Sequence, residues 1–505
     1  MYIVSASEMY EIDRIATEDK GLDGRILMEN AGQALTEKIK QHINKRTKVL
    51  ILVGSGNNGG DGYVIARSLY NQCYQVRIAQ VVSNEKIVGD AVYHKRVLER
   101  FGLQVEQFKS ISEFKTMIET ADIIVDAMLG LGVKGSVRSP IKEIIASVNA
   151  SNCITISVDL PSGVPADGIG DVEEVVCADY TYMIEASKLS VFLPKYASYY
   201  GEWDVVPIGL PIETISKQVK RGIWQAENVQ ASLPKRSAFS HKGTHGRGMI
   251  VGGSVGMPGS ITMTAKAALR SGVGLLTIAT VEQAISTIAA RCPEATFLSL
   301  VNQNGGIIDQ TVNLSGYDAC VIGMGMGRTE EARLFTNRLL GQADIPIIVD
   351  ADGLNHLTDS LKILSDRKAP TILTPHPGEM ASLMKSSITD VTNHAFDVTK
   401  EFAQTYQVYL VLKGTYTLVT TPTGKQWVNV TGNAGLAKGG SGDTLAGIIL
   451  AMIMQQQSLE SAIMNSCFIH GKAADTLVNF NHSTYDLLAT DVIEALPSVF
   501  RTFLD

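Results

Sequence analysis

Apolar and polar residues follow one another along this chain in blocks that predict alternating strands and helices. Residues 62–73 and 90–102 place apolar side chains at the spacing of an amphipathic helix. Around them lie four apolar, β-branched runs of strand length, at residues 48–54, 74–82, 121–129 and 153–161. Strands that are apolar throughout and alternate with helices predict a parallel sheet covered on both faces, which is an α/β fold.

A polar stretch in the middle of the chain interrupts this alternation, which then starts afresh. The stretch shows no clear strand, whereas the second half repeats the strand–helix pattern and includes a predicted hairpin at residues 416–431. We therefore predict two α/β domains, at residues 1–215 and 235–505, joined by a linker at residues 216–234.

Length and composition set limits on function. The chain has 505 residues, of which 45% are apolar and 19% charged, enough for two or three globular domains. Its net charge of −7 and the absence of a basic stripe argue against a nucleic-acid partner. No apolar run reaches the roughly 18 residues of a membrane span, and the first residues do not resemble a signal peptide. Six cysteines without CxxC spacing predict buried free thiols in a cytoplasmic protein.

The stretch "GSGNNGGDG" at residues 54–62 follows the first predicted strand and precedes a helix. Gly54, Gly56 and Gly59 fit the pattern G-x-G-x-x-G, in which backbone N–H groups approach a phosphate at a helix N-terminus. A tight turn without a ligand is the simpler alternative. A dinucleotide dehydrogenase would also place an acidic residue about 20 positions further on. Residues 79–81 read "AQV" instead, which disfavours ordinary hydride transfer.

Two later strands end in aspartates. Asp126 leads into a glycine-rich loop, and Asp159 leads into "LPSG" at residues 160–163. Because ligands of open α/β sheets bind beyond the carboxyl ends of the strands, both loops can converge with the loop at residues 54–62 on one crevice. A single aspartate at a strand end can also simply cap the next turn.

Taken together, these motifs resemble a known family. "NNGGDG", "DAMLGLG" and "VDLPSG" are similar to the motifs of the NAD(P)H-hydrate epimerases, the YjeF N-terminal domain, over residues 1–215. The resemblance implies a Rossmann-like, doubly wound domain that interconverts the R and S forms of hydrated NADH or NADPH and holds K⁺. The implied potassium ligands are Asn58, Asp126 and Ser162, which offer the oxygen atoms that a hard cation requires.

The same resemblance implies a role for Asp159 as the proton-transfer group near the reacting carbon of the substrate. The other implied substrate contacts are Asn57, Asn58, Gly59, Gly60, Asp61, Gly130, Leu131, Gly132, Val133, Lys134, Gly135 and Ser136.

A second glycine-rich stretch, "AKGGSGD" at residues 437–443, precedes an apolar helix. Gly439, Gly440 and Gly442 leave the N-terminal amides of that helix open to an anion. Asp443 in the same turn can take a proton from a hydroxyl during phosphoryl transfer. An acidic residue that only complements the helix dipole is the alternative. The sequence has no G-x-x-x-x-G-K-[ST] motif, so a nucleotide would be bound here by another architecture.

This loop resembles the anion hole of the ribokinase-like superfamily, and its surroundings extend the likeness. "VDADGLN", "LTPHPGEM", "LKGTYTLV" and "GNAGLAKGGSGDTLAGII" occur in the order of the ADP- or ATP-dependent NAD(P)H-hydrate dehydratases, over residues 235–500. The resemblance implies a ribokinase-like α/β domain that removes water from the S hydrate and restores NADH or NADPH while a nucleotide is cleaved. The fusion of two domains favours the bacterial or archaeal type, which uses ADP and releases AMP and phosphate.

Asp443 is the catalytic base that this resemblance implies, and it would touch the substrate together with Ser260, Gly325 and His376. Taken alone, His376 could equally be a capping or packed histidine. Mg²⁺ is expected with the nucleotide, and the aspartates of residues 349–353 either bind this ion or form a structural turn. The implied nucleotide contacts are Lys413, Gly414, Thr415, Tyr416, Thr417, Gly439, Gly440, Ser441 and Gly442.

The two halves together predict a bifunctional repair enzyme, in which an epimerase supplies the S hydrate that the dehydratase accepts. The kinase-like loop implies that the hydroxyl of the hydrate is phosphorylated first and that phosphate is then expelled. The alternative functions are those of a small-molecule kinase and of a nucleotide-binding regulatory module. We further expect a homo-oligomer whose partners are small molecules, namely the hydrates and ADP.

Overall fold

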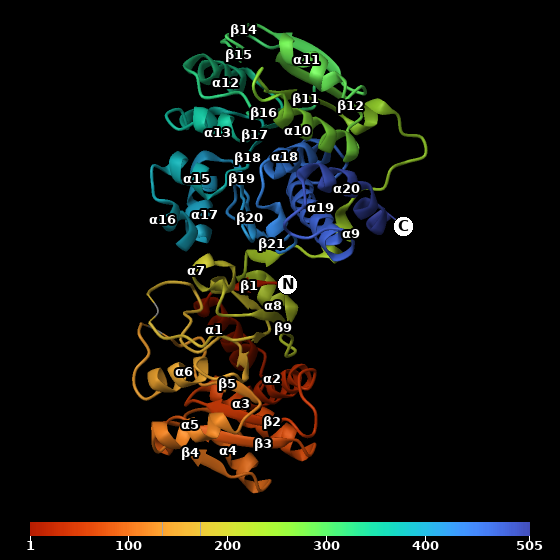
Figure 1. Ribbon diagram of the computed structural model, residues 1–505. Coiled ribbons are helices and arrows are strands. Elements are labelled where there is room, and N and C mark those ends of the chain that lie inside the picture. Colours follow the sequence, from red (N-terminus) through yellow and green to blue (C-terminus); the bar gives the residue numbers. More distant parts are fainter. Residues whose placement is uncertain (134, 172, 505) are drawn as a thin grey trace. The chain divides into compact units, whose positions relative to one another are not determined.

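The computed structural model describes residues 1–133, 135–171 and 173–504. The chain divides into two compact units, Met1–Lys220 and Arg221–Asp505. Each unit is an α/β structure with its own central sheet and its own helices (Figure 1). This architecture confirms the predicted α/β class.

The first unit is built on a parallel sheet, as expected from strands that are apolar on both faces. The described strands of this seven-stranded sheet follow in the order β4 (Val105–Gln107), β3 (Gln75–Gln80), β2 (Lys48–Val53), β5 (Ile123–Ala127), β6 (Ile154–Val158), β7 (Tyr180–Ile184) and β9 (Glu202–Val206). All of its neighbours pair in parallel. A separate parallel pair joins β1 (Ile3–Val4) to β8 (Ser187–Lys188).

Helices cover both faces of this sheet (Figure 1). On one face lie α2 (Gly24–Ile39), α3 (Asn57–Asn71) and α4 (Asp90–Arg100), and on the other lie α5 (Ile111–Glu119) and α6 (Ile141–Asn149). The unit also contains α1 (Ala6–Arg14), α7 (Pro194–Ala197) and α8 (Ile212–Gln218), and α1 packs against both β1 and α8. Val49, Ile51 and Val53 of β2 belong to the core beneath α2, α3 and α4. Leu50 and Leu52 belong to the core beneath α5 and α6. Successive side chains of β2 thus point to opposite faces, and both faces are buried.

The strand order reverses between β2 and β5. The chain passes from β2 to β3 and β4 on one side, and then returns to β5 on the other side of β2. Loops that leave two such strands in opposite directions open a crevice at the carboxyl ends of the strands. The glycine loop after β2 and the Asp126 loop at the end of β5 both lie at this point.

The second unit has a larger, mixed sheet. Its ten described strands follow in the order β10 (Arg221–Ile223), β21 (Gln426–Asn429), β20 (Thr417–Thr420), β19 (Tyr409–Leu412), β18 (Thr371–Leu373), β17 (Ile347–Val349), β16 (Ala319–Ile322), β11 (Arg247–Val251), β12 (Leu275–Val281) and β13 (Thr296–Leu300). β20 pairs antiparallel with β19 and with β21, which confirms the predicted hairpin. The other pairs are parallel, and the order reverses between β11 and β16.

One helix of this unit, α18 (Ser441–Ile453), is apolar on all sides because other elements surround it. It packs against α10 (Pro258–Arg270), α19 (Leu459–Phe480), β16 and β17. A Cβ on Gly447 would lie 2.1 Å from the backbone oxygen of Thr264, so glycine allows α18 to approach α10 closely. The other helices are α9 (Ala226–Ser232), α10 (Pro258–Arg270), α11 (Glu282–Ala289), α12 (Glu330–Gln342), α13 (Asp352–His356), α14 (Lys362–Asp366), α15 (Pro377–Met384), α16 (Ile388–Asn393), α17 (Ala395–Tyr406), α19 (Leu459–Phe480) and α20 (Ala489–Leu504). A short antiparallel pair, β14 (Asn302–Gln303) and β15 (Gly306–Ile307), lies outside the main sheet.

Residues 216–234, expected to be a linker, carry secondary structure for most of their length. β10 adds a parallel edge strand beside β21, and α9 packs on α19. The indole N–H of Trp224 also donates to Asn465 Oδ1 on α19 (2.9 Å). A three-residue edge strand is too short to produce a periodic pattern, so the sequence showed no strand here. Most of the expected linker thus belongs to the second unit.

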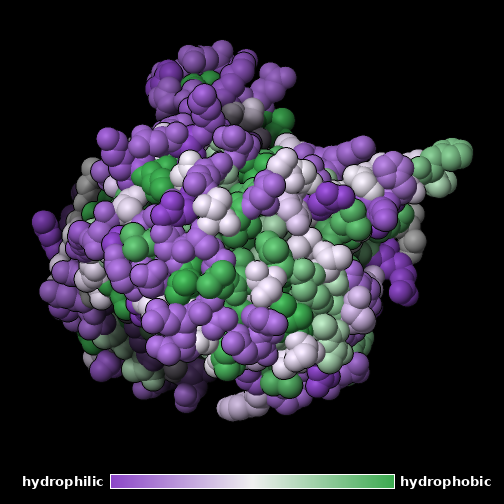
Figure 2. Space-filling view, turned by 90° about the horizontal axis from the view of Figure 1, so that it is seen from above, coloured by the Kyte–Doolittle hydropathy of each residue, from purple (hydrophilic) through white to green (hydrophobic). Residues whose placement is uncertain are grey.

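The surface mixes polar and apolar side chains, as the composition suggests. On the face shown in Figure 2, hydrophilic residues surround a patch of hydrophobic ones. Of the six cysteines, Cys73 and Cys177 are exposed and Cys153 is half-buried, so the prediction of uniformly buried thiols was wrong. Across the described residues, no helix combines the length and the apolar character that crossing a membrane requires.

Candidate active sites

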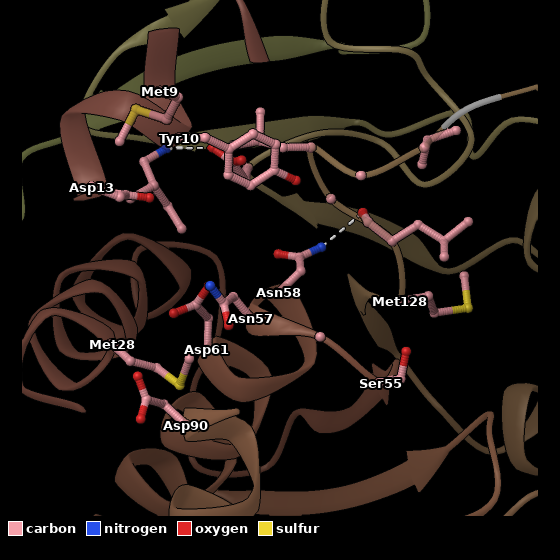
Figure 3. Close-up of a pocket in the computed structure, with 18 of the residues that line it drawn as sticks. Met9, Tyr10, Asp13, Met28, Ser55, Asn57, Asn58, Asp61, Asp90 and Met128 are labelled. Carbon is pink, nitrogen blue, oxygen red and sulfur yellow. Dashed lines mark hydrogen bonds between the residues drawn. The ribbon is translucent and has the colours of Figure 1, made fainter. Parts of the chain in front are cut away.

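The first unit contains a cavity of about 920 Å³ at the switch point of its sheet. It is lined by the loops that follow β2, β5 and β6, by α1 and α2, and by the first turns of α3. Figure 3 shows side chains from these elements directed into it, among them Asp13, Asn58 and Asp61. Both the place and the volume are usual for a small-molecule site in an α/β fold.

Most glycines of the first loop are required for close packing of the backbone and do not open space for a ligand. A Cβ on Gly54 would lie 1.8 Å from Met128 O, and one on Gly59 would lie 2.3 Å from Gly54 O. Gly56 differs, because a Cβ there would meet no atom of the described chain within 4 Å. Gly56 is also the N-cap of α3. Of these three glycines, Gly56 therefore leaves open space at a helix start, where an anion is favoured.

We expect Gly54→Ala to lower the free energy of unfolding of the first unit by about 3 kcal/mol, because the added methyl group overlaps backbone atoms. Gly56→Ala is the matched control and should change it by less than about 1 kcal/mol. Hydrogen exchange of the β2 amides in the full-length chain measures both values. Equal losses for the two variants would contradict this account of the loop.

Asp126 joins the loop after β5 to the loop after β6. Its Oδ1 accepts hydrogen bonds from the N–H of Met128 (3.2 Å) and the hydroxyl of Ser162 (2.5 Å). Its Oδ2 accepts from the N–H of Ser162 (2.8 Å) and the hydroxyl of Ser157 (2.9 Å). Burial raises the pKa of Asp126, while these hydrogen bonds oppose the shift.

Asn58 joins the same network through the backbone of Leu129. Its Nδ2 donates to Leu129 O (2.8 Å), and the N–H of Leu129 donates to the Ser162 hydroxyl (2.9 Å). The other side-chain atom, Asn58 Oδ1, is buried and has no hydrogen-bond partner among the described residues. A buried amide oxygen without a donor is suited to bind a cation. The structure thus brings together the three residues predicted to hold potassium.

Asp159 follows β6 and adopts a positive φ of 65°. Its Oδ1 accepts hydrogen bonds from the N–H of Ile184 (2.9 Å) and from the ammonium group of Lys188. The Lys188 side chain is 1% exposed and donates further bonds to the backbone oxygens of Ile184 and Ala186, both at 3.0 Å. The Lys188 ammonium group thus has an acceptor for each of its three protons, and one of these acceptors is the Asp159 carboxylate.

Sequence reasoning missed Lys188. The available signal was a lysine at the start of an apolar stretch, residues 188–194, in which a solvated charge is not expected.

Two further acidic groups face this ion pair. Asp13 on α1 and Asp61 on α3 line the cavity, and Figure 3 shows both directed into it. Burial raises the pKa of Asp61 well above its ordinary value, and the negative charges of Asp159 and Asp13 add to the shift. Burial also raises the pKa of Asp13 to about 6. Asp61 was predicted as a substrate contact, whereas Asp13 was missed because it resembles any polar position of an amphipathic helix.

The other predicted contacts of the first unit are only partly in the cavity. A Cβ on Gly60 would lie 2.3 Å from Met28 Sδ, so Gly60 serves helix packing, whereas Gly59 packs against the backbone of Gly54. Lys134 lies outside the described residues. Those that line the cavity are Asn57, Gly130, Leu131, Gly132, Val133, Gly135 and Ser136.

Gln80 occupies the end of β3, where a dehydrogenase carries its ribose-binding acid. It is buried, and its Oε1 accepts hydrogen bonds from the hydroxyl of Tyr63 (2.9 Å) and the ammonium of Lys95 (2.7 Å). The Gln80 side chain is therefore part of the core. This supports the prediction that the first unit does not catalyse ordinary hydride transfer.

The second candidate site lies at the N-terminus of α18. Gly440 is the N-cap, and its φ of 95° suits a residue without a Cβ. A Cβ on Gly439 would meet no atom of the described chain within 4 Å. Gly439 therefore leaves the approach to the first helical amides open, as an anion site requires.

Lys413 points at this helix start. Its Nζ donates to Asp350 Oδ1 (2.8 Å) and lies 3.8 Å from Glu379 Oε2. A Cβ on Gly442 would lie only 3.2 Å from the same Nζ. Burial lowers the pKa of Lys413, but Asp350 and Glu379 outweigh that effect, so the pKa is raised and the lysine stays charged. A cation beside a helix N-terminus is well suited to a phosphate group.

Asp443 lies in the first turn of α18. Burial raises its pKa to about 6, the charge of Asp350 adds to the shift, and a hydrogen bond with Ser260 opposes it. An aspartate that only complemented the helix dipole would have a lowered pKa, because the dipole favours the charged form. A pKa near 6 instead suits a group that exchanges protons near neutral pH.

His376 is the N-cap of α15. Its Nδ1 accepts hydrogen bonds from the N–H groups of Gly378 (3.0 Å) and Glu379 (3.3 Å), and Glu379 Oε2 accepts from the N–H of His376 (2.8 Å). The ring proton therefore lies on Nε2. The structure thus supports the capping alternative; the ring is more than half exposed, and its Nε2 lies 3.6 Å from Glu379 Oε1.

Ser260 and Gly325, predicted to line the same substrate, are neighbours in the structure. A Cβ on Gly325 would lie 3.5 Å from Ser260 Cβ, and the Ser260 side chain opposes the rise in the pKa of Asp443. In the loop after β19, Gly414 and Thr415 are exposed, and Thr417 begins β20. Ser441 is half-buried at the start of α18.

The aspartates of residues 349–353 have different roles. Asp350 pairs with Lys413, whereas Asp352 accepts the N–H of Gly327 (2.9 Å) and bonds Arg328 Nε (3.2 Å). No group of three or more His, Cys, Asp or Glu side chains that could hold a metal occurs in the part of the chain that the structure describes. Sequence reasoning missed Glu379, which caps α15 and also faces Lys413.

The fold and the two sites define a two-domain α/β enzyme, with a Rossmann-like first domain and a ribokinase-like second domain. A ribokinase-like superfamily protein from Enterococcus faecalis supports the second assignment at a TM-score of 0.50, with 24% identity over 56% of this chain and 96% of that one. The chain also resembles an ADP/ATP-dependent NAD(P)H-hydrate dehydratase from Bacillus subtilis, with 35% identity over 56% of this chain and 98% of that one and a TM-score of 0.49.

Family comparisons cover both domains. Residues 24–190 match the YjeF-related protein N-terminus, and residues 249–498 match the NAD(P)H-hydrate dehydratase family. The bifunctional NAD(P)H-hydrate repair enzyme Nnr of Moorella thermoacetica is 33% identical over 99% of this chain and 97% of its own length. This chain belongs to the family of bifunctional NAD(P)H-hydrate repair enzymes.

Proposed function

We propose that this protein repairs hydrated NADH and NADPH in two steps. The first unit interconverts the R and S hydrates, and the second unit dehydrates the S form at the expense of ADP, which yields AMP and phosphate. The observation that carries the proposal is the Asp443 carboxyl group, held with a raised pKa beside Lys413 at the N-terminus of α18. That arrangement supports proton removal from a hydroxyl next to a phosphate site.

In the second unit, we assign the nucleotide to residues 413–417 and 439–442. Lys413 would neutralise its phosphates, and the first amides of α18 would bind the group in transfer. Asp443 would take the proton of the substrate hydroxyl as the terminal phosphoryl group moves to that oxygen. Loss of this phosphate, with the electrons of the carbon–oxygen bond, and loss of a proton from the adjacent carbon would restore the dihydronicotinamide. Mg²⁺ would arrive with the nucleotide phosphates.

In the first unit, Asp159 would exchange a proton with the hydroxyl group or water at the hydrated carbon. The open helix start at Gly56 and the glycine-rich loop after β5 would face the phosphates of the substrate. We assign K⁺ to Asn58, Asp126 and Ser162. The buried, unpartnered Asn58 Oδ1 supports the fit, because K⁺ is bound by oxygen atoms that replace its hydration shell. When bound, this ion would supply a fixed positive charge next to the phosphate-binding loops.

The test is to incubate the full-length protein with a mixture of R and S NADPH hydrates and with ADP, ATP or no nucleotide. The returning near-ultraviolet absorbance of the dihydronicotinamide is then followed. We expect complete recovery with ADP. With Asp159→Ala the S hydrate should be consumed normally, while the R hydrate reacts about 100-fold more slowly. Asp171→Ala, on the exposed surface of the same unit, is the control.

No recovery with either nucleotide would remove the repair proposal. Transfer of phosphate to a product that keeps it would favour a small-molecule kinase, and binding without turnover would favour a regulatory module. The homo-oligomer and the cytoplasmic location stay predictions.

A further inference from the structure

The cavity of the first unit presents two carboxyl groups whose surroundings differ. Asp159 bonds to the buried ammonium group of Lys188. Asp61 is 6% exposed, and no hydrogen bond to its carboxyl group is found within the described residues. Both side chains line the same cavity. Asp61 is therefore a nearly buried polar group that faces an internal space without a protein partner.

The surroundings of the two groups also differ in charge. Burial raises the pKa of Asp61, and the charge of Asp159 keeps it raised. Lys188 supplies the compensating positive charge to Asp159, through the Oδ1 atom that it bonds. Two carboxyl groups in such different surroundings, one buried without a partner and one paired with a lysine, are suited to divide the acid and base roles.

The elements that carry these groups come from different strands of the sheet. Asp61 lies in the second turn of the helix that follows β2, and Asp159 directly follows β6. In the sheet, β2 and β6 are separated by β5, so their ends are about 10 Å apart. Asp61 and Asp159 therefore reach the same cavity of about 920 Å³ from segments that follow two strands on either side of β5.

Inversion at a hydrated carbon needs a proton donor and a proton acceptor on opposite faces. The hydroxyl leaves one face as water after it gains a proton, and a new water adds to the other face after it loses one. A single carboxyl group lies on one face of the carbon, so it can serve the departing hydroxyl or the incoming water but not both.

We propose that Asp61 and Asp159 form a two-carboxyl pair that flanks the hydrated carbon and serves one face each. This inference rests on the proposed epimerase function of the first unit. In one direction Asp61 gives its proton to the hydroxyl, the carbon–oxygen bond breaks, and the ring nitrogen supplies the electron pair that forms a carbon–nitrogen double bond. Water then attacks the opposite face and gives a proton to Asp159. In the other direction, the same two groups exchange roles.

The test uses oxygen exchange, which separates the two faces. Full-length wild type, Asp61→Asn and Asp159→Asn are incubated in ¹⁸O-labelled water with each purified epimer and without nucleotide. Mass spectrometry after chromatographic separation then reports label and inversion for each epimer. In the wild type, we expect inversion and label in both epimers.

Each single variant should lose inversion by at least about 100-fold and still exchange oxygen with retention in one epimer. The exchanging epimer should differ between Asp61→Asn and Asp159→Asn, because each variant keeps a different carboxyl group. If either aspartate had a purely structural role, its variant would exchange oxygen more slowly in both epimers. Asp171→Asn is the control for a carboxyl group outside the cavity.

Inversion by Asp61→Asn within about tenfold of the wild-type rate, or loss of exchange in both epimers, would overturn the two-carboxyl pair and leave the proposed function intact. A wild-type protein that inverts neither epimer would overturn the proposed function, and this inference with it.

Discussion

Asp443→Asn should lower the rate of nucleotide-dependent dehydration by about 1000-fold, because the amide cannot accept the proton of the substrate hydroxyl. The wild-type rate should also fall as the pH drops through about 6, since burial raises the pKa of Asp443 to about 6 and only the charged form acts as a base. The neighbours that set this value are Lys413, Asp350, Asp352 and Ser260. The measurement is the pH profile of kcat with the S hydrate and ADP.

The matched control for this variant is Glu330→Gln, which removes an exposed acid from the first turn of α12 in the same unit. If the carboxylate of Asp443 acted only on the helix dipole, both variants would cost similar fractions of a kcal/mol in stability and neither would stop turnover. An Asp443→Asn protein with a normal rate, or one that keeps the acid limb of the profile, would contradict the assignment of this residue as the base.

Lys188→Met should lower the free energy of unfolding of the first unit by about 3–5 kcal/mol. The side chain is 1% exposed and bonds Asp159 and two backbone oxygens, so its removal leaves a buried carboxylate and two carbonyl groups without their donor. The double variant Lys188→Met/Asp159→Asn removes both charges and should recover at least half of the loss. Hydrogen exchange of the β6 and β7 amides, in the full-length chain, measures this stability.

Lys38→Met is the comparison for this second prediction. Lys38 also pairs with an aspartate in the first unit, Asp204 (2.6 Å), but both side chains are partly exposed. An ion pair in water contributes about 0–1 kcal/mol, so this variant should change little. Equal effects of Lys38→Met and Lys188→Met would show that burial of the Asp159 pair is not what stabilises this part of the fold.

The two candidate sites share one structural arrangement. In each unit, a glycine-rich loop opens a helix at the carboxyl side of the sheet, and an aspartate with a raised pKa lies in the first two turns of that helix: Asp61 on α3 and Asp443 on α18. Helix amides attract an anion, while burial keeps the carboxyl group able to hold a proton. Phosphate binding and proton transfer are thereby combined within one short segment.

The sequence by itself determined the α/β class, the presence of two domains and the place of both glycine loops. These features depend on neighbours in the chain: the period of apolar residues defines strands and helices, and a glycine cluster marks where a strand passes into a helix. For the same reason, the pattern of apolar runs is enough to select residues at strand ends, such as Asp126 and Asp159. The edge strand β10 escaped prediction because three residues show no period.

Only the tertiary structure decided which charged side chains form ion pairs. Lys188 and Asp159 are 29 positions apart in the chain, and Lys413 and Asp350 are 63 positions apart, yet each pair forms a hydrogen-bonded ion pair. The protonation of Asp61 likewise depends on burial and on charges carried by other elements. Periodicity reports local backbone structure, whereas electrostatic coupling depends on distances through space and on exclusion of water, which a chain acquires only when it folds.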